Sequence, residues 1–231
     1  MSGFPRRRRV YLMRHGAVSY FDETGTPLPS ETVPLSPKGV GQAEAAAEAL
    51  AHIEFDRVLT SSLPRTRETA RIVQRDRGLV PTEVAELREI RPGKLREIPE
   101  NELEETFTQA FAAVTLGTRF LNGETFESFC GRILPNWQAF RDDPTWTTAL
   151  VVLHGGVNRL ILGEALGIHV SAERPTPLGA LEQDPACINV LDVADDGSSV
   201  IRLVNFTPYA RLKEGIRHTT MEELLLEYRP R

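Results

Sequence analysis

Two histidines directly precede glycines, and these residue types could take part in catalysis. His15 lies between Arg14 and Gly16, and His154 precedes Gly155. A histidine with its ordinary pKa of about 6.5 has a free ring nitrogen at neutral pH and can attack a phosphorus atom. An arginine beside it can bind phosphate oxygens, and glycine lets the backbone approach a ligand closely. The pair predicts a phosphoryl-transfer site, whereas either histidine alone is more often an ordinary turn or core residue.

Both histidines follow predicted strands. Val10–Met13 is a short apolar run between a basic segment and a glycine, and Ala149–Leu153 is rich in β-branched residues. Open α/β sheets bind their ligands at the carboxyl ends of their strands. The two His-Gly turns are therefore expected at the edge of the sheet where a ligand would bind.

The rest of the chain alternates strands with helices. Ser36 is predicted to cap a helix that has Pro37 at its first position. The other predicted strands are Phe55–Thr60, Cys187–Val193 and Ser199–Val204, and the predicted helical segments are Gln42–His52, Arg65–Arg75, Glu104–Val114, Thr125–Phe140 and Val157–Leu166. This order predicts an α/β fold: a three-layer sandwich with a mostly parallel central sheet and helices on both faces.

The composition is that of a globular protein. Apolar residues make up 41% of the chain, enough for a sizeable core, and we expect residues 1–231 to form one domain. The net charge of -5 does not favour binding of nucleic acid or an anionic membrane, and no apolar run approaches the roughly 20 residues of a membrane span. Cys130 and Cys187 form no metal-ligand or disulfide pattern, which fits a reducing cytoplasm. The oligomeric state, including a homodimer, stays open.

Two segments lie outside these predicted elements. The basic N-terminal arm, residues 1–9 with Arg6–Arg9, is expected to be a flexible, solvated terminus rather than an anion-binding or nucleic-acid-binding arm. The loop Asp22–Pro34 is polar and rich in proline and glycine. Since it is too long for a simple turn, we expect it to shape the substrate entrance.

The order of short motifs along the chain resembles that of the histidine phosphatase superfamily, the phosphoglycerate mutase-like enzymes. The resemblance runs from the first predicted strand to Cys187–Val193. Its motifs, besides Arg14-His15-Gly16, are Leu35-Ser36-Pro37-Lys38-Gly39 with Gln42-Ala43, Ser61-Ser62-Leu63-Pro64-Arg65 with Thr69-Ala70, Leu87-Arg88-Glu89 before Gly93, Gly123-Glu124-Thr125 with Phe129 and Arg132, and His154-Gly155.

The resemblance implies a role for each catalytic side chain. His15 would be the nucleophile, Arg14 and Arg65 would bind the phosphoryl oxygens, and His154 with Gly155 would complete the phosphate site. Glu89 would protonate the leaving oxygen and later take a proton from water. Two other glutamates, Glu83 and Glu86, lie close enough in sequence to compete for this role.

Two departures from the family pattern bear on the substrate. Phe21 stands where the mutases usually have asparagine, and the segment Ile90–Arg96 lacks an ending common among the family's phosphatases. We favour hydrolysis of a small phosphorylated metabolite over phosphate transfer within a sugar acid. A mutase remains the alternative because four cations could bind a second anionic group, and a regulatory phosphate-binding protein of low turnover is a third reading. These cations are Arg88, Arg91, Lys94 and Arg96.

Neither a cofactor nor a metal is expected. Gly39-Val40-Gly41 lacks the third glycine and the strand-turn-helix position of a dinucleotide-binding fingerprint. No helix carries a His-x-x-x-His pair, and no cysteine pair or aspartate cluster has metal-ligand spacing. We therefore expect hydrolysis that does not depend on a metal.

Overall fold

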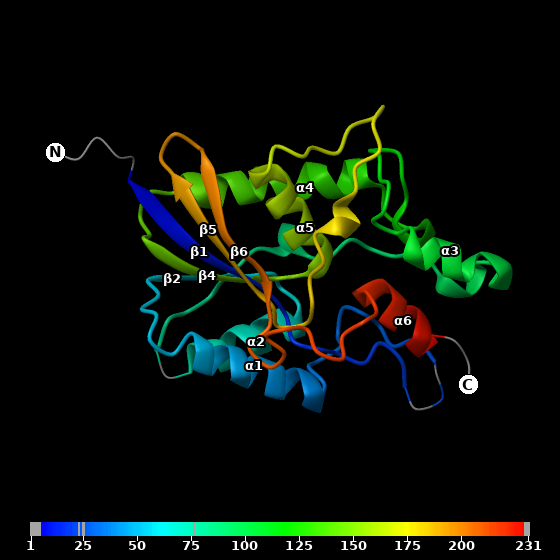
Figure 1. The fold of residues 1–231 in the computed structure, drawn as a ribbon, viewed down its shortest axis with the longest axis horizontal. Coiled ribbons are helices and arrows are strands. Elements are labelled where there is room, and N and C mark those ends of the chain that lie inside the picture. The colour runs from blue at the N-terminus through cyan, green and yellow to red at the C-terminus, as the bar shows by residue number, and fades with distance from the viewer. Residues whose placement is uncertain (1–5, 23, 25, 76, 229–231) are drawn as a thin grey trace.

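A mixed sheet of six strands forms the centre of the molecule (Figure 1). The computed structural model describes residues 6–22, 24, 26–75 and 77–228. The strand order is β3-β2-β4-β1-β5-β6, in which β3, β2, β4 and β1 are parallel and β5 runs antiparallel to both of its neighbours. The strands are β1 (Arg7–Arg14), β2 (Arg57–Thr60), β3 (Thr82–Glu83), β4 (Thr148–Leu153), β5 (Ile188–Ala194) and β6 (Ser199–Phe206).

Helices cover both faces of the sheet, so the predicted three-layer α/β fold is confirmed. In Figure 1 one pair of helices, α1 (Pro37–Ala49) and α2 (Pro64–Gln74), lies below the sheet, and a second pair, α4 (Phe126–Asp142) and α5 (Gly155–Ala165), lies above it. Two helices, α3 (Leu103–Thr108) and α6 (Thr220–Tyr228), lie together beyond one end of the sheet. Short 3-10 helices occupy Ala85–Leu87, Leu95–Glu97, Glu100–Glu102, Phe120–Asn122 and Leu178–Ala180.

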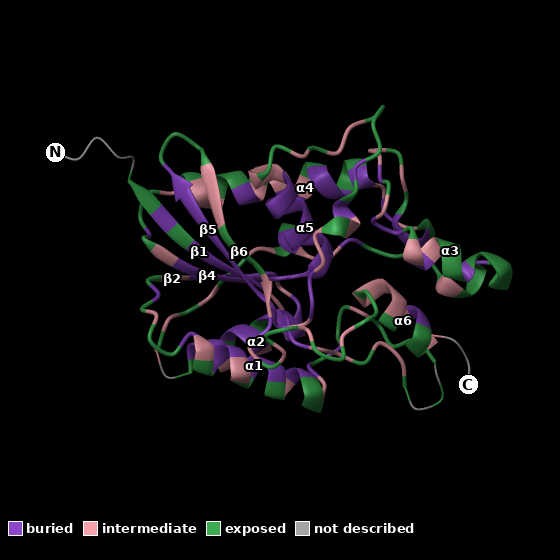
Figure 2. Cartoon of the chain, in the orientation of Figure 1, coloured by how far each residue is buried: buried purple, intermediate pink, exposed green. Residues whose placement is uncertain are grey.

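Alternate side chains of β1 belong to the two cores on either side of the sheet, as the period of two in a strand requires. Val10 and Leu12 pack in the cluster that contains residues of α4 and α5, while Tyr11 and Met13 pack in the cluster with residues of α1 and α2. Figure 2 shows the resulting band of buried residues through the sheet and the inner sides of the helices. This two-sided burial explains the unbroken apolar runs Val10–Met13 in β1 and Ala149–Leu153 in β4.

Most helix predictions are confirmed, and so is the predicted cap at Ser36. Ser36 caps α1 by accepting from the Gly39 N–H at 3.1 Å, and Thr125 caps α4 by accepting from the Ser128 N–H. The helix predicted over Glu104–Val114 is wrong beyond Thr108.

Residues beyond α3 use their backbone groups elsewhere, which explains that error. The Val114 N–H donates to Thr176 O at 3.0 Å and the Gly179 N–H donates to Phe111 O at 2.7 Å, so the chain pairs with a distant segment instead of continuing the helix. Neither α6 nor the short strand β3 was predicted.

The prediction of a flexible basic arm is wrong for Arg7–Arg9, which belong to β1. Arg8 is buried: its guanidinium lies over the Trp146 ring at 4.6 Å and donates to the carbonyls of Arg141 and Asp143. Arg9 forms an ion pair with Asp192 at 2.7 Å. These acceptors compensate the charges and allow a basic strand end to join the sheet. The rest of the predicted arm, apart from Arg6, lies outside the described residues.

Candidate active site

The two histidines end neighbouring parallel strands. Arg14 of β1 is in register with Leu153 of β4, and the His15 N–H donates to Leu153 O at 3.0 Å. The rings of His15 and His154 consequently lie near each other, with centroids 5.2 Å apart and planes at 66°. Only 2% of His15 and none of His154 is exposed. The structure thus brings together the two His-Gly turns singled out in the sequence.

The hydrogen bonds of His15 decide which of its ring nitrogens is free. Nδ1 lies 2.7 Å from Gly16 O, which can only accept, so Nδ1 carries the proton. Nε2 then holds the lone pair, toward which the Nε–H of Arg65 points at 3.2 Å. Burial lowers the pKa of His15 well below 6.5, and the charges of Arg65 and Arg14 lower it further. At neutral pH the ring is therefore uncharged, with an unprotonated Nε2 that accepts a hydrogen bond from Arg65.

His154 is held by a hydroxyl on the loop after β2. Its Nε2 lies 2.8 Å from Ser61 Oγ, while its buried Nδ1 has no partner in the protein. With Ser61 as the donor, the proton of His154 is on Nδ1 and can be donated to a bound oxyanion. Burial, followed by the charge of Arg65, lowers the pKa of His154 well below its usual 6.5, so this histidine is also neutral.

Two arginines border the histidines. Arg65, at the start of α2, is 2% exposed and also donates to Ser30 O at 2.6 Å. Arg14 donates through Nη1 to Gln183 O at 2.7 Å, and its buried Nε has no partner. A Cβ at Gly155 would come within 3.5 Å of that Nε. The guanidiniums thus keep donors available beside His15 and at the N-terminus of α5, which is a favourable place for an anion.

Glycine is required where the Arg-His-Gly turn crosses the start of α1. A Cβ on Gly16 would lie 2.4 Å from Gly39 O, and a Cβ on Gly39 would lie 2.0 Å from Ala17 O. The Ala17 N–H donates to Gln42 Oε1 at 2.9 Å. The motif at residues 35–43 therefore packs against the turn that carries His15 and supports it.

Of the three candidate glutamates, the structure places Glu89 beside the histidines. Its Oε2 accepts from the Gly156 N–H at 2.9 Å, and its Oε1 accepts from the Ile90 N–H at 3.0 Å. Since Gly156 is two residues after His154, the half-buried carboxylate borders the same end of α5. Glu86 and Glu83 are exposed, and Glu83 lies 3.6 Å from Arg67 in an ion pair.

The four cations considered for a second anionic group do not gather. The Nε of Arg88 donates to Ser62 Oγ at 2.7 Å near the site. Arg91 forms an ion pair with Glu124, Lys94 with Glu97, and Arg96 is exposed. Only Arg88 is bonded to the loop that holds His154.

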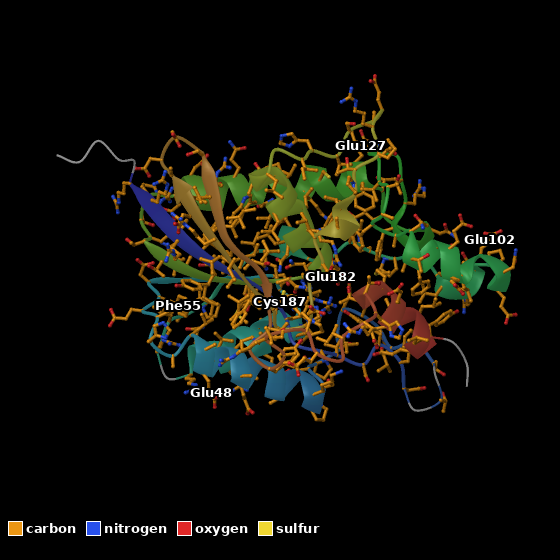
Figure 3. The ribbon with its side chains drawn as sticks, in the orientation of Figure 1. Glu48, Phe55, Glu102, Glu127, Glu182 and Cys187 are labelled. Carbon is orange, nitrogen blue, oxygen red and sulfur yellow. The ribbon has the colours of Figure 1, made fainter. Side chains whose placement is uncertain are left out.

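A buried ion pair close to Gly155 was not predicted from the sequence. Arg159 of α5, 3% exposed, pairs with Glu182 at 2.9 Å, and Glu182 also accepts from Thr220 Oγ1 at 2.8 Å. Glu182, labelled in Figure 3, lies between α5 and α6 and ties them together. An arginine next to Asn158 in the mainly apolar stretch from Val157 to Leu162 was the available signal, because a buried charge requires a partner.

The buried histidines should make stability depend on pH. Because their folded-state pKa values lie below the unfolded value of about 6.5, the unfolded chain takes up more protons below that pH. We expect the free energy of unfolding to be greatest above about pH 6.5 and to fall as the pH decreases from about 7 to 5. The free energy of unfolding should be measured by urea denaturation at several pH values across this range. Its dependence on pH should be weaker in His154→Gln than in the wild type and unchanged in His52→Gln, a control at an exposed position. An unchanged dependence on pH in His154→Gln would contradict the burial of a neutral ring.

Two further properties of the described part of the chain concern ligands and membranes. No group of three or more histidine, cysteine, aspartate or glutamate side chains is arranged there to hold a metal ion. None of the helices in those residues has the length and apolar character needed to span a membrane.

Comparisons of the sequence and of the structure with known proteins find phosphatases and a mutase-like protein. The family model described as histidine phosphatase superfamily (branch 1) matches residues 10–206. An adenosylcobalamin/alpha-ribazole phosphatase of Salmonella typhimurium is 28% identical over 85% of this chain and 96% of its own. A protein of Escherichia coli named "Probable phosphoglycerate mutase GpmB" is 30% identical over 72% of this chain and 78% of its own. The crystal structure of the alpha-ribazole phosphatase from Shigella flexneri has the same fold, with a TM-score of 0.67 at 24% identity over 85% of this chain and 96% of that one.

Proposed function

This chain belongs to the histidine phosphatase superfamily, branch 1, and from that membership we propose that it hydrolyses a small phosphomonoester through a phosphohistidine on His15. One observation carries the proposal: the buried, uncharged His15 keeps its Nε2 unprotonated beside the guanidinium of Arg65, with the charge of Arg14 and the ring of His154 close by. A neutral imidazole so surrounded can be a nucleophile toward a bound phosphoryl group.

The reaction consists of two displacements at phosphorus. His15 Nε2 attacks, the bond from phosphorus to the ester oxygen breaks, and Glu89 gives its proton to the departing oxygen. Water then attacks the phosphohistidine, the phosphorus–nitrogen bond breaks, and Glu89 takes back a proton from that water. Inorganic phosphate leaves, and His15 returns to its neutral state. The position of Glu89 beside Gly156 supports its role as the group that carries the proton in both steps.

The remaining donors would stabilise the transferring phosphoryl group. Arg65 and Arg14 have planar guanidiniums suited to phosphate oxygens, and His154 has an unpartnered Nδ1. The Gly155 N–H begins α5, where the helix dipole also favours an anion. These groups are already fixed by Ser30, Gln183 and Ser61, so little reorganisation is needed when charge develops on the oxygens.

The ion pairs of the cations near the site favour hydrolysis over intramolecular phosphate transfer. A mutase must hold a second anionic group, but Arg91 and Lys94 are paired with Glu124 and Glu97 outside the site. Two of the relatives are phosphatases acting on alpha-ribazole compounds, which supports a small phosphomonoester of an organic alcohol as the substrate class. The relative named as a phosphoglycerate mutase makes phosphate transfer within a sugar acid the second candidate.

We further propose that the reaction needs no metal ion and takes place in the cytoplasm, with residues 1–231 acting as one domain. The groups proposed to bind the phosphate are mainly N–H donors of arginine, histidine and the backbone, which bind the oxygens of an anion. The phosphate charge can therefore be neutralised by the protein itself.

A panel of phosphorylated metabolites incubated with excess chelator tests the proposal. The panel should include sugar phosphates, nucleoside monophosphates and phosphoglycerates, and each reaction should be scored for inorganic phosphate and for isomerised product. We expect phosphate release from alkyl monoesters that chelation leaves unchanged, and no isomerisation. Isomerised phosphoglycerate without phosphate release would establish the mutase instead. Activity that vanished with chelator and returned with one divalent ion would overturn metal-independent hydrolysis.

A further inference from the structure

We infer that Arg132, held by Glu124, is a positioning residue that fixes Glu89 for proton transfer. This inference rests on the proposed role of Glu89 as general acid. Arg132 belongs to α4, and its hydrogen bonds go to the segment that carries Glu89 and to Glu124, although the effect of its charge is the smallest of those that lower the pKa of His154. Its contacts show how a side chain outside the phosphate site can determine where the acid lies.

All five N–H groups of Arg132 have acceptors, and three of these N–H groups donate to backbone carbonyls in the segment that carries Glu89. Nη1 donates to the carbonyls of Glu86 and Arg88, each at 2.6 Å, and Nη2 donates to the carbonyl of Glu89 itself at 2.9 Å. The remaining two N–H groups bind the carboxylate of Glu124, from Nε and Nη2, both at 2.9 Å. Because no donor is left over, Arg132 can position the acid but has no hydrogen bond to offer to a substrate.

Glu124 binds the same segment from its other end. Its Oε2 accepts from the Arg91 N–H at 3.1 Å, and its own N–H donates to Arg91 O at 2.9 Å. The Ser128 hydroxyl donates to Oε1 at 2.9 Å. The carboxylate and Arg132 together therefore bind backbone groups at residues 86, 88, 89 and 91, on both sides of the catalytic side chain.

Two glycines let the chains come close enough for these bonds. A Cβ on Gly123 would lie 2.3 Å from Arg91 O, and a Cβ on Gly93 would lie 2.8 Å from Asn122 O. The Gly93 N–H donates to Leu121 O at 3.0 Å. The glycines of two sequence motifs thus lie where two backbone segments cross in close contact. This close contact places Glu124 against the segment that carries Glu89.

Glu89 needs this external support because its own segment has no regular structure. It lies two residues beyond the 3-10 helix Ala85–Leu87, and the segment from Arg88 to Lys94 is neither helix nor strand. Its carboxylate is held by the Ile90 and Gly156 N–H groups, but those bonds do not fix the backbone from which the side chain extends. Displacement of a catalytic group by about 1 Å can cost on the order of 10²-fold in rate.

The ion pair remains formed at the pH values where a phosphatase would be assayed. Burial by itself raises the pKa of Glu124, but the hydrogen bonds from Arg132 and the Arg91 N–H, with the charge of Arg132, lower it to about 2. The side chain of Glu124 is 2% exposed, so the pair is shielded from salt as well.

The experiment compares single-turnover phosphohistidine formation from an alkyl phosphate and from nitrophenyl phosphate. Only the alkyl leaving group needs a proton, so a misplaced acid slows that substrate selectively. The variants are Arg132→Lys, which keeps the charge but loses the planar fork, and Glu124→Gln, which keeps the shape of the carboxylate. Glu89→Gln gives the effect of losing the acid. Arg141→Met is the control: it lies on the same helix and pairs with Glu164, away from Glu89.

We expect Arg132→Lys and Glu124→Gln to lose at least about 10-fold in rate with the alkyl phosphate, with little change in KM, and less than about 3-fold with nitrophenyl phosphate. In combination with Glu89→Gln, Arg132→Lys should cause no further loss, because the acid is already gone. Arg141→Met should react at the wild-type rate with both substrates.

Several results would overturn the inference. Equal losses with both substrates would show that Arg132 supports the fold or the phosphate site in general, and a further loss added to that of Glu89→Gln would show that it acts independently of the acid. If Arg132→Lys is too unstable to assay, Glu124→Gln decides the question: equal losses with the alkyl and the nitrophenyl phosphate in that variant would contradict the inference. If Glu89→Gln itself shows no selectivity, the acid assignment fails and this inference fails with it. If Glu89→Gln is selective and the two positioning variants are not, only the inference about Arg132 is wrong.

Discussion

His15→Ala should lower the turnover of every phosphomonoester substrate by at least about 10⁴-fold, the scale of loss when a covalent nucleophile is removed from an enzyme. Alanine cannot form a bond to phosphorus, whereas Arg14, Arg65 and His154 would still bind the phosphoryl oxygens. We therefore expect the affinity for inorganic phosphate, measured as product inhibition or by calorimetry, to survive far better than kcat does.

His52→Ala provides a control for the general loss of a histidine, because His52 is exposed in the turn that follows α1. It should retain wild-type kcat and KM. Thermal denaturation of His15→Ala should confirm a folded protein before its kinetics are interpreted. Turnover within about tenfold of the wild type in a folded His15→Ala would mean that water attacks the phosphorus directly, and the two-step mechanism would be wrong.

Glu89→Gln should lose about 10² to 10⁴-fold in the rate of phosphohistidine formation from alkyl phosphates, the usual range for general acid catalysis. An alkyl alcohol leaves as a strongly basic alkoxide and needs a proton as its bond to phosphorus breaks. Nitrophenolate is a stable anion, so the same variant should lose less than about 10-fold with nitrophenyl phosphate. Glutamine keeps the size of the side chain and can still accept from the Gly156 N–H, so the change removes mainly the transferable proton.

Single-turnover measurement of the first step is essential here, because Glu89 is also proposed to activate the water of the second step. Glu86→Gln is the matched control: Glu86 lies three residues away, is exposed, and has no contact with α5 among the bonds of the described residues. It should behave as wild type with both substrates. Equal losses for both leaving groups in Glu89→Gln would leave that residue with a structural or positioning role.

The sequence predicts this fold well because its main elements have strong local signals. Apolar runs with β-branched residues define β1 and β4, and the Ser36-Pro37 and Thr125 caps define the starts of α1 and α4. The signals fail where distant backbone segments compete for hydrogen bonds. The helix expected through Val114 ends at Thr108 because residues 111–114 bond to residues 176–179.

The convergence of the candidate site residues was predictable to a similar degree, and for a similar reason. Residues that belong to motifs, His15, His154, Arg65 and Glu89, converge at the ends of two adjacent strands and the start of α5. Much of what holds them was not predictable, because the partners of Arg14, Arg65 and His154 are backbone carbonyls or a side chain remote in sequence. Gln183 O holds Arg14 across 169 positions, for example, and no local pattern reports such a bond.

Trapping the phosphohistidine tests the central claim most directly. Enzyme mixed briefly with ³²P-labelled substrate and quenched in alkali should retain acid-labile, alkali-stable label, and peptide mapping should place that label on His15. The His15→Ala variant should remain unlabelled under the same conditions, while Glu89→Gln given nitrophenyl phosphate should accumulate label, because its second step is slowed. Absence of label in wild type during active turnover, or equal labelling of wild type and His15→Ala, would contradict catalysis through a covalent intermediate on His15.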